Sequence, residues 1–521
     1  MGVPSIRLRL ASKLQRSLPQ QPFVCRRCLH QQSQAGTIFR PQQRAPVKQA
    51  YLPRALRQTR PQSTASPTQQ PSVSPLSALS QNISRTHSRP HPGTSSTSTS
   101  TSWPETNSRT VAYWLLASAT SVFGIVIFGG LTRLTESGLS ITEWRPVTGS
   151  FPPRNQEVWE QEFARYKLSP EFKMLNSRMT LEEFKQIYWM EWTHRLWGRV
   201  VGVTFLLPTL YFVVRRRVTR GMAGRLGGIC GLICFQGFIG WWMVKSGLKD
   251  DLLETGKHPR VSQYRLAAHL GTAFVAYLAM VWNGVRILQE HALVRDPGEG
   301  LKALQRLGGK ELRPFRRSVA ALSVLVFVTA MSGALVAGLD AGLVYNDFPW
   351  MGQGLLPPKR EMFDPFYSHT PSRNDLIWRN MFENPVLAQL DHRILATTTF
   401  CAVFGLWGYS RFSPAVRTML PKAAKTGMLG VVHLVSLQVV LGITTLWFLV
   451  PTPLAAAHQA GALALLTGVL VLGSRVWVPR GMVRLLQKRV AAAAAAVGVQ
   501  SKSAVGRRGA DAMLKARIQS S

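Results

Sequence analysis

The chain has 521 residues, of which 46% are apolar, and a formal net charge of +37 at pH 7. The apolar residues form long blocks separated by basic connectors, which is the distribution of an integral membrane protein. The Lys and Arg residues lie mainly in a leader, in short connectors and in a C-terminal tail. They do not form the single basic face of a nucleic-acid-binding domain, so we expect no nucleic-acid partner.

The first 104 residues form a basic leader. They contain 14 Lys and Arg residues, no acidic residue, and many Ser, Gln and Pro residues. This composition is typical of a mitochondrial transit peptide. The segment "PGTSSTSTSTS" has the composition of a linker without a packed core. We therefore assign residues 1–105 to a transit peptide and linker.

A helix needs about 20 mostly apolar residues to cross a bilayer. Eight segments meet this requirement, at 111–131, 191–214, 224–244, 266–288, 317–338, 387–410, 426–449 and 454–474. The connectors after the second and sixth segments are basic, whereas 132–188 carries eight basic and eight acidic residues and 339–388 carries four and six. The positive-inside rule then places both termini in the matrix and the two long connectors in the intermembrane space.

Three helix starts are predicted from local sequence. Thr180 and Glu183 form a capping-box pattern that begins the second span. Asn384 before Pro385 and Thr452 before Pro453 each place a cap residue ahead of a proline in the first turn.

The two halves of the chain repeat each other. "HR" at 194–195 recurs at 392–393, "QGFIG" at 236–240 resembles "QVVLG" at 438–442, and "LAAHLGTA" at 266–273 resembles "AAAHQAGA" at 455–462. Four spans per copy imply that both copies cross the membrane in the same sense. The predicted fold class is an all-α integral membrane protein with eight transmembrane helices, arranged as a parallel tandem repeat of two four-helix bundles. The halves are 106–290 and 317–475, joined by a matrix connector at 291–316 and followed by a basic matrix tail at 476–521.

Cysteines form no framework. Cys25 and Cys28 make a CxxC in the leader without a second pair, so a metal or redox role is the less favoured reading. We expect Cys230, Cys234 and Cys401 to be small packing residues.

Four of the five histidines within apolar spans share one pattern. His194, His269, His392 and His458 each lie within about two turns of the start of an even-numbered span, and they form two repeat-related pairs. His433, on an odd-numbered span, has no counterpart, and we expect it to serve packing or a polar relay.

Paired imidazoles on transmembrane helices suit bis-histidine haem, because iron takes two neutral nitrogen donors on opposite faces of the porphyrin. A zinc or di-iron site needs more converging ligands than these spans provide. Arg195 and Arg393 follow two of the histidines, and we expect them either to pair with haem propionates or to extend to the membrane interface.

The halves differ three residues before the first histidine of each pair. Glu191 occupies this position in the first half and Gln389 in the second, while Asp391 points about 100° away from the ligand face. The first site thus has an ionisable group near its histidine, and the second has a neutral one. This difference favours a first haem site at which the reaction takes place and a second that stores or relays electrons. The alternative is that Glu191 only caps or forms a salt bridge at the interface.

These features resemble the haem A synthases of the mitochondrial type. The resemblance covers about residues 110–475 and includes "GLSITEWRPVTG", "YWMEWTHRLWGR", "GWWMVKSGL", "GLDAGLVYNDFP" and "LAAAHQAGAL". It implies oxidation of the C8 methyl group of haem O to the formyl group of haem A, for cytochrome c oxidase assembly. It further implies that His194 and His269 bracket the substrate haem, with Glu191 catalytic, and that His392 and His458 ligate a haem b.

The resemblance also implies partners. They are mitochondrial ferredoxin and its reductase as electron source, with haem O synthase, inner-membrane lipid and a second copy of the chain as further candidates. From the residues alone, a di-haem b-type electron-transfer cytochrome is the alternative, but it leaves Glu191 without a role. A transporter is less favoured, because the spans show no unwound half-helices.

Overall fold

The computed structural model describes residues 103–249 and 259–496. The predicted transit peptide and the end of the basic tail lie outside these residues, as do Cys25 and Cys28. Within the described ranges the chain is helical, without β-strands, and only Met351 and Gly354 form an isolated bridge.

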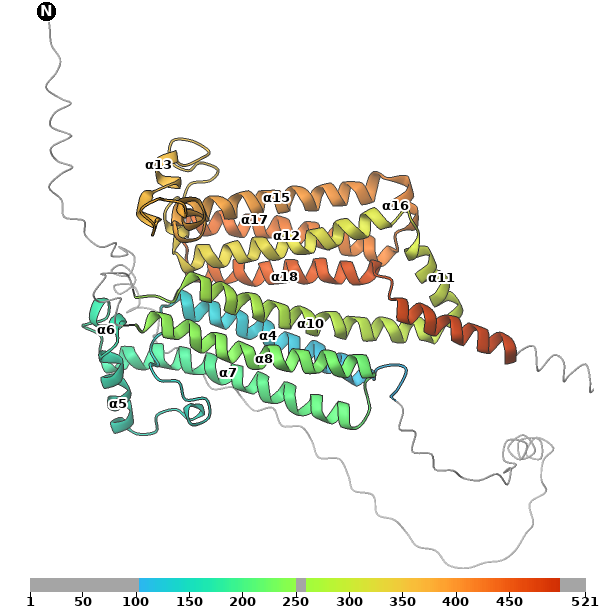
Figure 1. Ribbon diagram of the computed structural model, residues 1–521, viewed down its shortest axis with the longest axis horizontal. Coiled ribbons are helices and arrows are strands. Elements are labelled where there is room, and N and C mark those ends of the chain that lie inside the picture. Colours follow the sequence, from blue (N-terminus) through green and yellow to red (C-terminus); the bar gives the residue numbers. More distant parts are fainter. Residues whose placement is uncertain (1–102, 250–258, 497–521) are drawn as a thin grey trace, which may run out of the picture. The chain divides into compact units, whose positions relative to one another are not determined.

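Long helices form the body of the fold (Figure 1). In chain order they are α4 (Arg109–Leu134), α7 (Leu181–Val214), α8 (Arg220–Gly247), α10 (Gln263–Arg295), α12 (Arg313–Gly338), α15 (Pro385–Phe412), α17 (Lys422–Trp447) and α18 (Thr452–Val476). Among the described residues, seven helices are long and apolar enough to cross a membrane, and α15 is not among them. Asp391, His392, Arg393 and Arg411 shorten the apolar stretch of α15. The eighth predicted span therefore stays a prediction.

Each half forms a ring of four helices. In the N-terminal half α4 packs on α7, α7 on α8, α8 on α10, and α10 on α4. In the C-terminal half α12, α15, α17 and α18 pack in the same cyclic order. The rings meet where α10 contacts α12 and α18 and where α4 contacts α18, and one apolar core extends through both. The short helices α11 (Pro297–Gly308) and α16 (Pro414–Met419) lie in connectors.

Two of the three predicted helix starts are confirmed. Thr180 and Glu183 form both bonds of the capping box before α7, and the Asn384 side chain caps α15 by accepting from Val386 N. The prediction for Thr452 was wrong. The helix α18 already includes Thr452, its N-cap is Pro451, and no side-chain bond caps it, because proline supplies the required φ without a capping side chain.

The cysteine prediction was only partly right. Cys230 is half-buried, whereas Cys234 and Cys401 are exposed on the helix surfaces. Cys234 and Cys401 therefore do not pack inside the helical rings but point to the outer surface of the bundle.

The connector between α4 and α7 folds on an extension of α7. It contains η2 (Thr148–Ser150), α5 (Gln156–Lys167) and α6 (Pro170–Met174). A separate aromatic cluster joins it to the first two turns of α7, with members Trp159, Phe163, Tyr166, Phe184 and Tyr188. This connector is thus a small packed unit rather than a loose loop.

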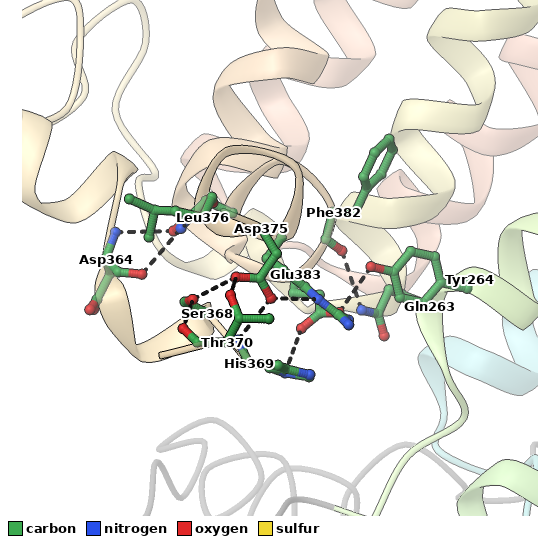
Figure 2. Close-up of polar contacts among 12 residues, drawn as sticks. Gln263, Tyr264, Asp364, Ser368, His369, Thr370, Asp375, Leu376, Phe382 and Glu383 are labelled. Atoms are coloured by element: carbon green, nitrogen blue, oxygen red, sulfur yellow. Dashed lines mark hydrogen bonds and ion pairs between the residues drawn. The ribbon is translucent and has the colours of Figure 1, made fainter. Parts of the chain in front are cut away.

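The connector between α12 and α15 is held by polar contacts. It contains η3 (Ala341–Leu343), α13 (Lys359–Met362), η4 (Pro365–Tyr367) and α14 (Leu376–Glu383). Figure 2 shows Glu383 and the Phe382 carbonyl facing the start of α10, where Tyr264 Oη donates to Glu383 at 3.0 Å and Gln263 Nε2 donates to Phe382 O at 3.2 Å. Asp375 accepts bonds from Ser368, Thr370 and the His369 backbone, and these bonds hold the pKa of its carboxyl below the usual range. The connector of one half therefore binds the other half.

A second link between the halves is an ion-pair triad. Asp340, just after α12, receives Arg133 Nη2 at 2.7 Å from the end of α4 and Arg260 Nη1 at 3.1 Å from the segment before α10. Asp340 and its repeat counterpart Glu136 both adopt left-handed backbone conformations, with φ of 52° and 51°.

The connector before α7 contains a buried carboxyl group. Glu171 is 3% exposed and accepts a bond from Tyr166 Oη at 3.2 Å. Burial is the main cause that raises its pKa to about 8, and the nearby carboxylates Glu191 and Glu136 add to it. The folded state therefore binds a proton that the unfolded chain releases near pH 4.5.

We predict that the free energy of unfolding of this region falls as the pH rises from about 4.5 to about 8 and then levels off. Glu171→Gln removes the ionisation, so this pH dependence should disappear. Hydrogen exchange of α5 and α6 between pH 5 and 9 measures it. The control is Glu157→Gln on the exposed surface of α5, and an unaltered pH dependence in Glu171→Gln contradicts the assignment.

Candidate functional site

The four predicted histidines occupy equivalent helices of the two rings. His194 is on α7 and His269 on α10, while His392 is on α15 and His458 on α18. These are the second and fourth helices of each ring, which lie diagonally opposite each other. Each pair therefore faces the interior of its own ring.

The C-terminal pair could hold a metal ion between its two rings. The ring centroids of His392 and His458 are 6.4 Å apart and the ring planes make an angle of 89°. A metal–imidazole bond is about 2.0 Å and the ring centre lies about 1.1 Å further on, so two rings on one iron would have centroids about 6.2 Å apart. The observed separation fits a haem iron between the rings.

The N-terminal pair, His194 on α7 and His269 on α10, lies on the corresponding helices of the other ring. The Nδ1 atoms of both rings are buried without a hydrogen-bond partner, as is Nδ1 of His458. Buried polar atoms of this kind are rare and need an explanation. Among the described residues no group of three or more His, Cys, Asp or Glu could hold a metal ion.

A glycine on the preceding helix contacts each histidine ring. A Cβ atom on these glycines would lie 2.7 to 3.1 Å from the Cε1 atom of the imidazole, closer than normal packing allows. The contacts are Gly129 with His194, Gly240 with His269, Gly333 with His392, and Gly442 with His458. Our sequence analysis missed this role, although Gly240 and Gly442 end the repeated "QGFIG" and "QVVLG" segments. The backbone of a neighbouring helix therefore lies directly against the Cε1 edge of each imidazole.

Glu191 is buried and fully bonded. It is 2% exposed, and one carboxylate oxygen accepts from Ser140 Oγ at 2.7 Å and Ile141 N at 2.8 Å. The other accepts from Arg195 Nε at 3.0 Å and Nη2 at 2.6 Å. Arg195 also donates to the carbonyls of Ile141 and Glu143. The expected salt bridge is therefore present, and it attaches the first connector to α7 one turn before His194.

The C-terminal half keeps the same arrangement without the charge. Gln389 Nε2 donates to Tyr345 O at 2.9 Å, while its buried Oε1 has no partner. Arg393 donates to the carbonyls of Tyr345 and Asp347, both at 2.9 Å. Arg195 and Arg393 thus each bind the connector of their own half rather than extending freely to the interface.

A cavity of about 330 Å³ lies between the first connector and α7. Arg195 and Arg199 line it together with Glu143 and Arg145. Nη1 of Arg199 is buried and unpaired, although the other two donors of this side chain bind the carbonyls of Pro146 and Arg145. Arg199, which our sequence analysis did not select, therefore lines the cavity and has one buried donor without a partner.

His433 does not belong to the site. Its side chain is exposed on the surface of α17, so it does not pack inside the bundle, and the polar relay that was the other expectation stays a prediction.

The sequence matches known proteins over most of its length. The family model COX15-CtaA, described as cytochrome oxidase assembly protein, matches residues 112–470. Haem A synthase COX15 of Saccharomyces cerevisiae is 50% identical over 378 residues, which are 72% of this chain and 77% of that protein. The haem A synthase–mitochondrial ferredoxin fusion protein of Schizosaccharomyces pombe is 51% identical over 378 residues, 71% of this chain and 60% of the fusion. Haem A synthase COX15 of Homo sapiens is 49% identical over 362 residues, 70% and 81% of the two chains.

We predict that Gly442→Ala lowers the haem content of the purified protein, because its Cβ atom would lie 3.1 Å from the His458 ring and displace it. The measurement is the haem-to-protein ratio together with the absorption spectrum. Gly430→Ala is the matched control on the same helix, since a Cβ atom there meets nothing within 4 Å. Equal haem content in the two variants would show that the glycine does not position the ring.

Proposed function

We infer that this chain, which belongs to the COX15-CtaA family of cytochrome oxidase assembly proteins, is a haem A synthase. The relatives from two yeasts and from human carry that activity in their names and cover two thirds or more of this chain. The enzyme is an oxidoreductase that acts on haem O in a mitochondrial membrane. A di-haem electron-transfer cytochrome is not favoured by these similarities.

We propose that His194 and His269 hold the substrate haem, whose C8 methyl group is oxidised to a formyl group. Glu191 is one turn before His194 on α7 and therefore on the same side of the helix. Its carboxylate is held in place by Ser140, Ile141 and Arg195. A fixed anion there would stabilise positive charge that develops on the substrate, or would accept a proton from it.

We propose that His392 and His458 hold haem b as a resident cofactor that supplies electron transfer. The observation that supports this assignment best is the separation of 6.4 Å between their ring centroids. Gln389 replaces the carboxylate in this half, so no acid or base occupies the position one turn before the ligand. Arg393 and, in the first half, Arg195 and Arg199 are the candidate partners of haem propionates, and the unpaired donor of Arg199 supports the assignment there.

The proposed architecture is eight transmembrane helices in a parallel tandem repeat. The same cyclic helix order in both rings, the four glycine–histidine contacts and the matched left-handed residues Glu136 and Asp340 support it. We further propose that the leader, residues 1–105, targets the chain to the inner membrane. Both termini, the connector 291–316 and the tail 476–521 would face the matrix, and the haem sites would lie towards the intermembrane space.

The proposed electron source is mitochondrial ferredoxin with its reductase. One relative is a fusion of haem A synthase with mitochondrial ferredoxin, which supports a direct functional association. Haem O synthase, as the supplier of substrate, and a second copy of the chain remain proposed partners.

We predict that Glu191→Gln retains haem but forms no haem A. The glutamine keeps one acceptor oxygen, and Arg195 keeps its bonds to the Ile141 and Glu143 carbonyls, so the connector stays attached. The measurement is the identity of haems extracted from the purified protein and from cells. Glu182→Gln, on the exposed first turn of the same helix, is the control, and normal haem A levels in Glu191→Gln exclude a catalytic role.

We predict that single cysteines introduced at exposed positions of 143–160 react with a membrane-impermeant thiol reagent added outside the matrix. The reason is that the balanced charge of 132–188 is typical of the side opposite the basic connectors. Cysteines at 295–306 are the comparison and should react only after the inner membrane is opened. The reverse pattern would invert the proposed topology.

A further inference from the structure

The residue before the ring-contacting glycine differs between the two halves. On α4 it is Phe128, followed by Gly129, and on α12 it is Ser332, followed by Gly333. Phe128 and Ser332 are 204 positions apart, and so are Gly129 and Gly333. Otherwise the local arrangement is the same, because each glycine contacts Cε1 of the first histidine of its pair.

Ser332 lies within hydrogen-bonding distance of the His392 imidazole. Its hydroxyl donates to Thr329 O at 2.7 Å and lies 2.8 Å from His392 Nδ1. A serine has one hydroxyl proton and a carbonyl can only accept, so the serine oxygen accepts from Nδ1–H of the imidazole. The proton on Nδ1 leaves the lone pair on Nε2 free for a metal. A ligand whose second nitrogen is bonded in this way is oriented and made more basic.

Phe128 gives His194 a different environment. The two rings are stacked, with centroids 6.4 Å apart and an interplanar angle of 12°. Nδ1 of His194 is buried without a partner, and the phenyl ring can offer it no acceptor oxygen. The imidazole of the first site is thus held by packing alone, so neither its tautomer nor the basicity of its Nε2 is set by a hydrogen bond.

We propose that Ser332 is a positioning residue that makes haem binding at the His392 and His458 pair long-lived, and that Phe128 at the matching position keeps haem at the His194 and His269 pair exchangeable. This inference rests on the proposed function, in which one haem stays and the other is a substrate that leaves as product. The two halves then share one helix arrangement but exchange haem at different rates. The hydroxyl group of Ser332 causes this difference, because it strengthens one of the two iron ligands in the C-terminal half and has no equivalent in the N-terminal half.

The first test is the rate at which the purified protein loses haem b to an excess of apomyoglobin. Ser332→Ala should lose haem b about 10 to 100-fold faster than wild type, the range expected when a bond to a metal-ligating histidine is removed. Its haem b reduction potential should rise, since a less basic ligand stabilises the oxidised iron less. Ser323→Ala is the control on the same helix, where the hydroxyl bonds only Val319 O. Ser332→Thr keeps the hydroxyl and should restore the wild-type rate.

Equal loss rates and equal potentials for Ser332→Ala and Ser323→Ala, in protein that carries haem b, overturn the inference and leave the proposed function intact. Wild-type protein that carries no extractable haem b overturns both. These outcomes are distinguished by the haem extraction that precedes the kinetic measurement.

The second test compares Phe128→Ser with Phe128→Ala after both are loaded with haem O. Both variants remove the phenyl ring, so their difference isolates the hydroxyl group. The serine variant should release haem O to apomyoglobin about 10-fold more slowly than the alanine variant. Identical release rates overturn the role assigned to this position.

Discussion

The fold depends on one constraint, which is that two imidazoles on diagonally opposite helices must face each other across the apolar interior of a four-helix ring. For His392 and His458 the ring centroids are 6.4 Å apart, a separation that would accommodate a metal ion bound to both rings. The neighbouring helices must therefore keep the two histidine-bearing helices apart. They must also fill the space behind each imidazole. Glycine meets the second requirement, because only a backbone without Cβ can approach the ring so closely.

The two rings share one helix arrangement but differ in the side chains next to their histidines. Both place a buried side chain one turn before the first histidine, but Glu191 is charged and Gln389 is neutral. In both halves a residue of the preceding helix contacts the first histidine of the pair. This residue is Phe128 in the N-terminal half and Ser332 in the C-terminal half. In the proposed function, this difference separates the haem that reacts from the haem that carries electrons, while the helix arrangement stays the same.

The connectors are part of this arrangement rather than simple links. Arg195 and Arg393 each bind backbone carbonyls of the connector in their own half, next to a ligand. Glu383 and Asp340 then join the C-terminal connector to the N-terminal half. Because guanidinium groups donate in a planar fork, they hold carbonyl-rich segments firmly. The geometry at the ligands therefore depends on segments that contribute no ligand.

Much of this protein could be predicted from its sequence, because the relevant signals are local or periodic. Hydropathy located the seven helices that qualify as spans, since a bilayer demands long apolar segments. The capping box at Thr180 was readable from two residues, and the repeat selected the same four histidines that the structure places inside the rings. Only the tertiary structure decided that Arg195 pairs with Glu191 and the connector, and that glycines pack against the imidazoles. It also decided that Nη1 of Arg199 has no partner and that His433 and Cys401 are exposed. These features depend on how each helix is rotated about its axis and which neighbour it meets, and contacts between residues distant in the chain are set by packing of the whole bundle.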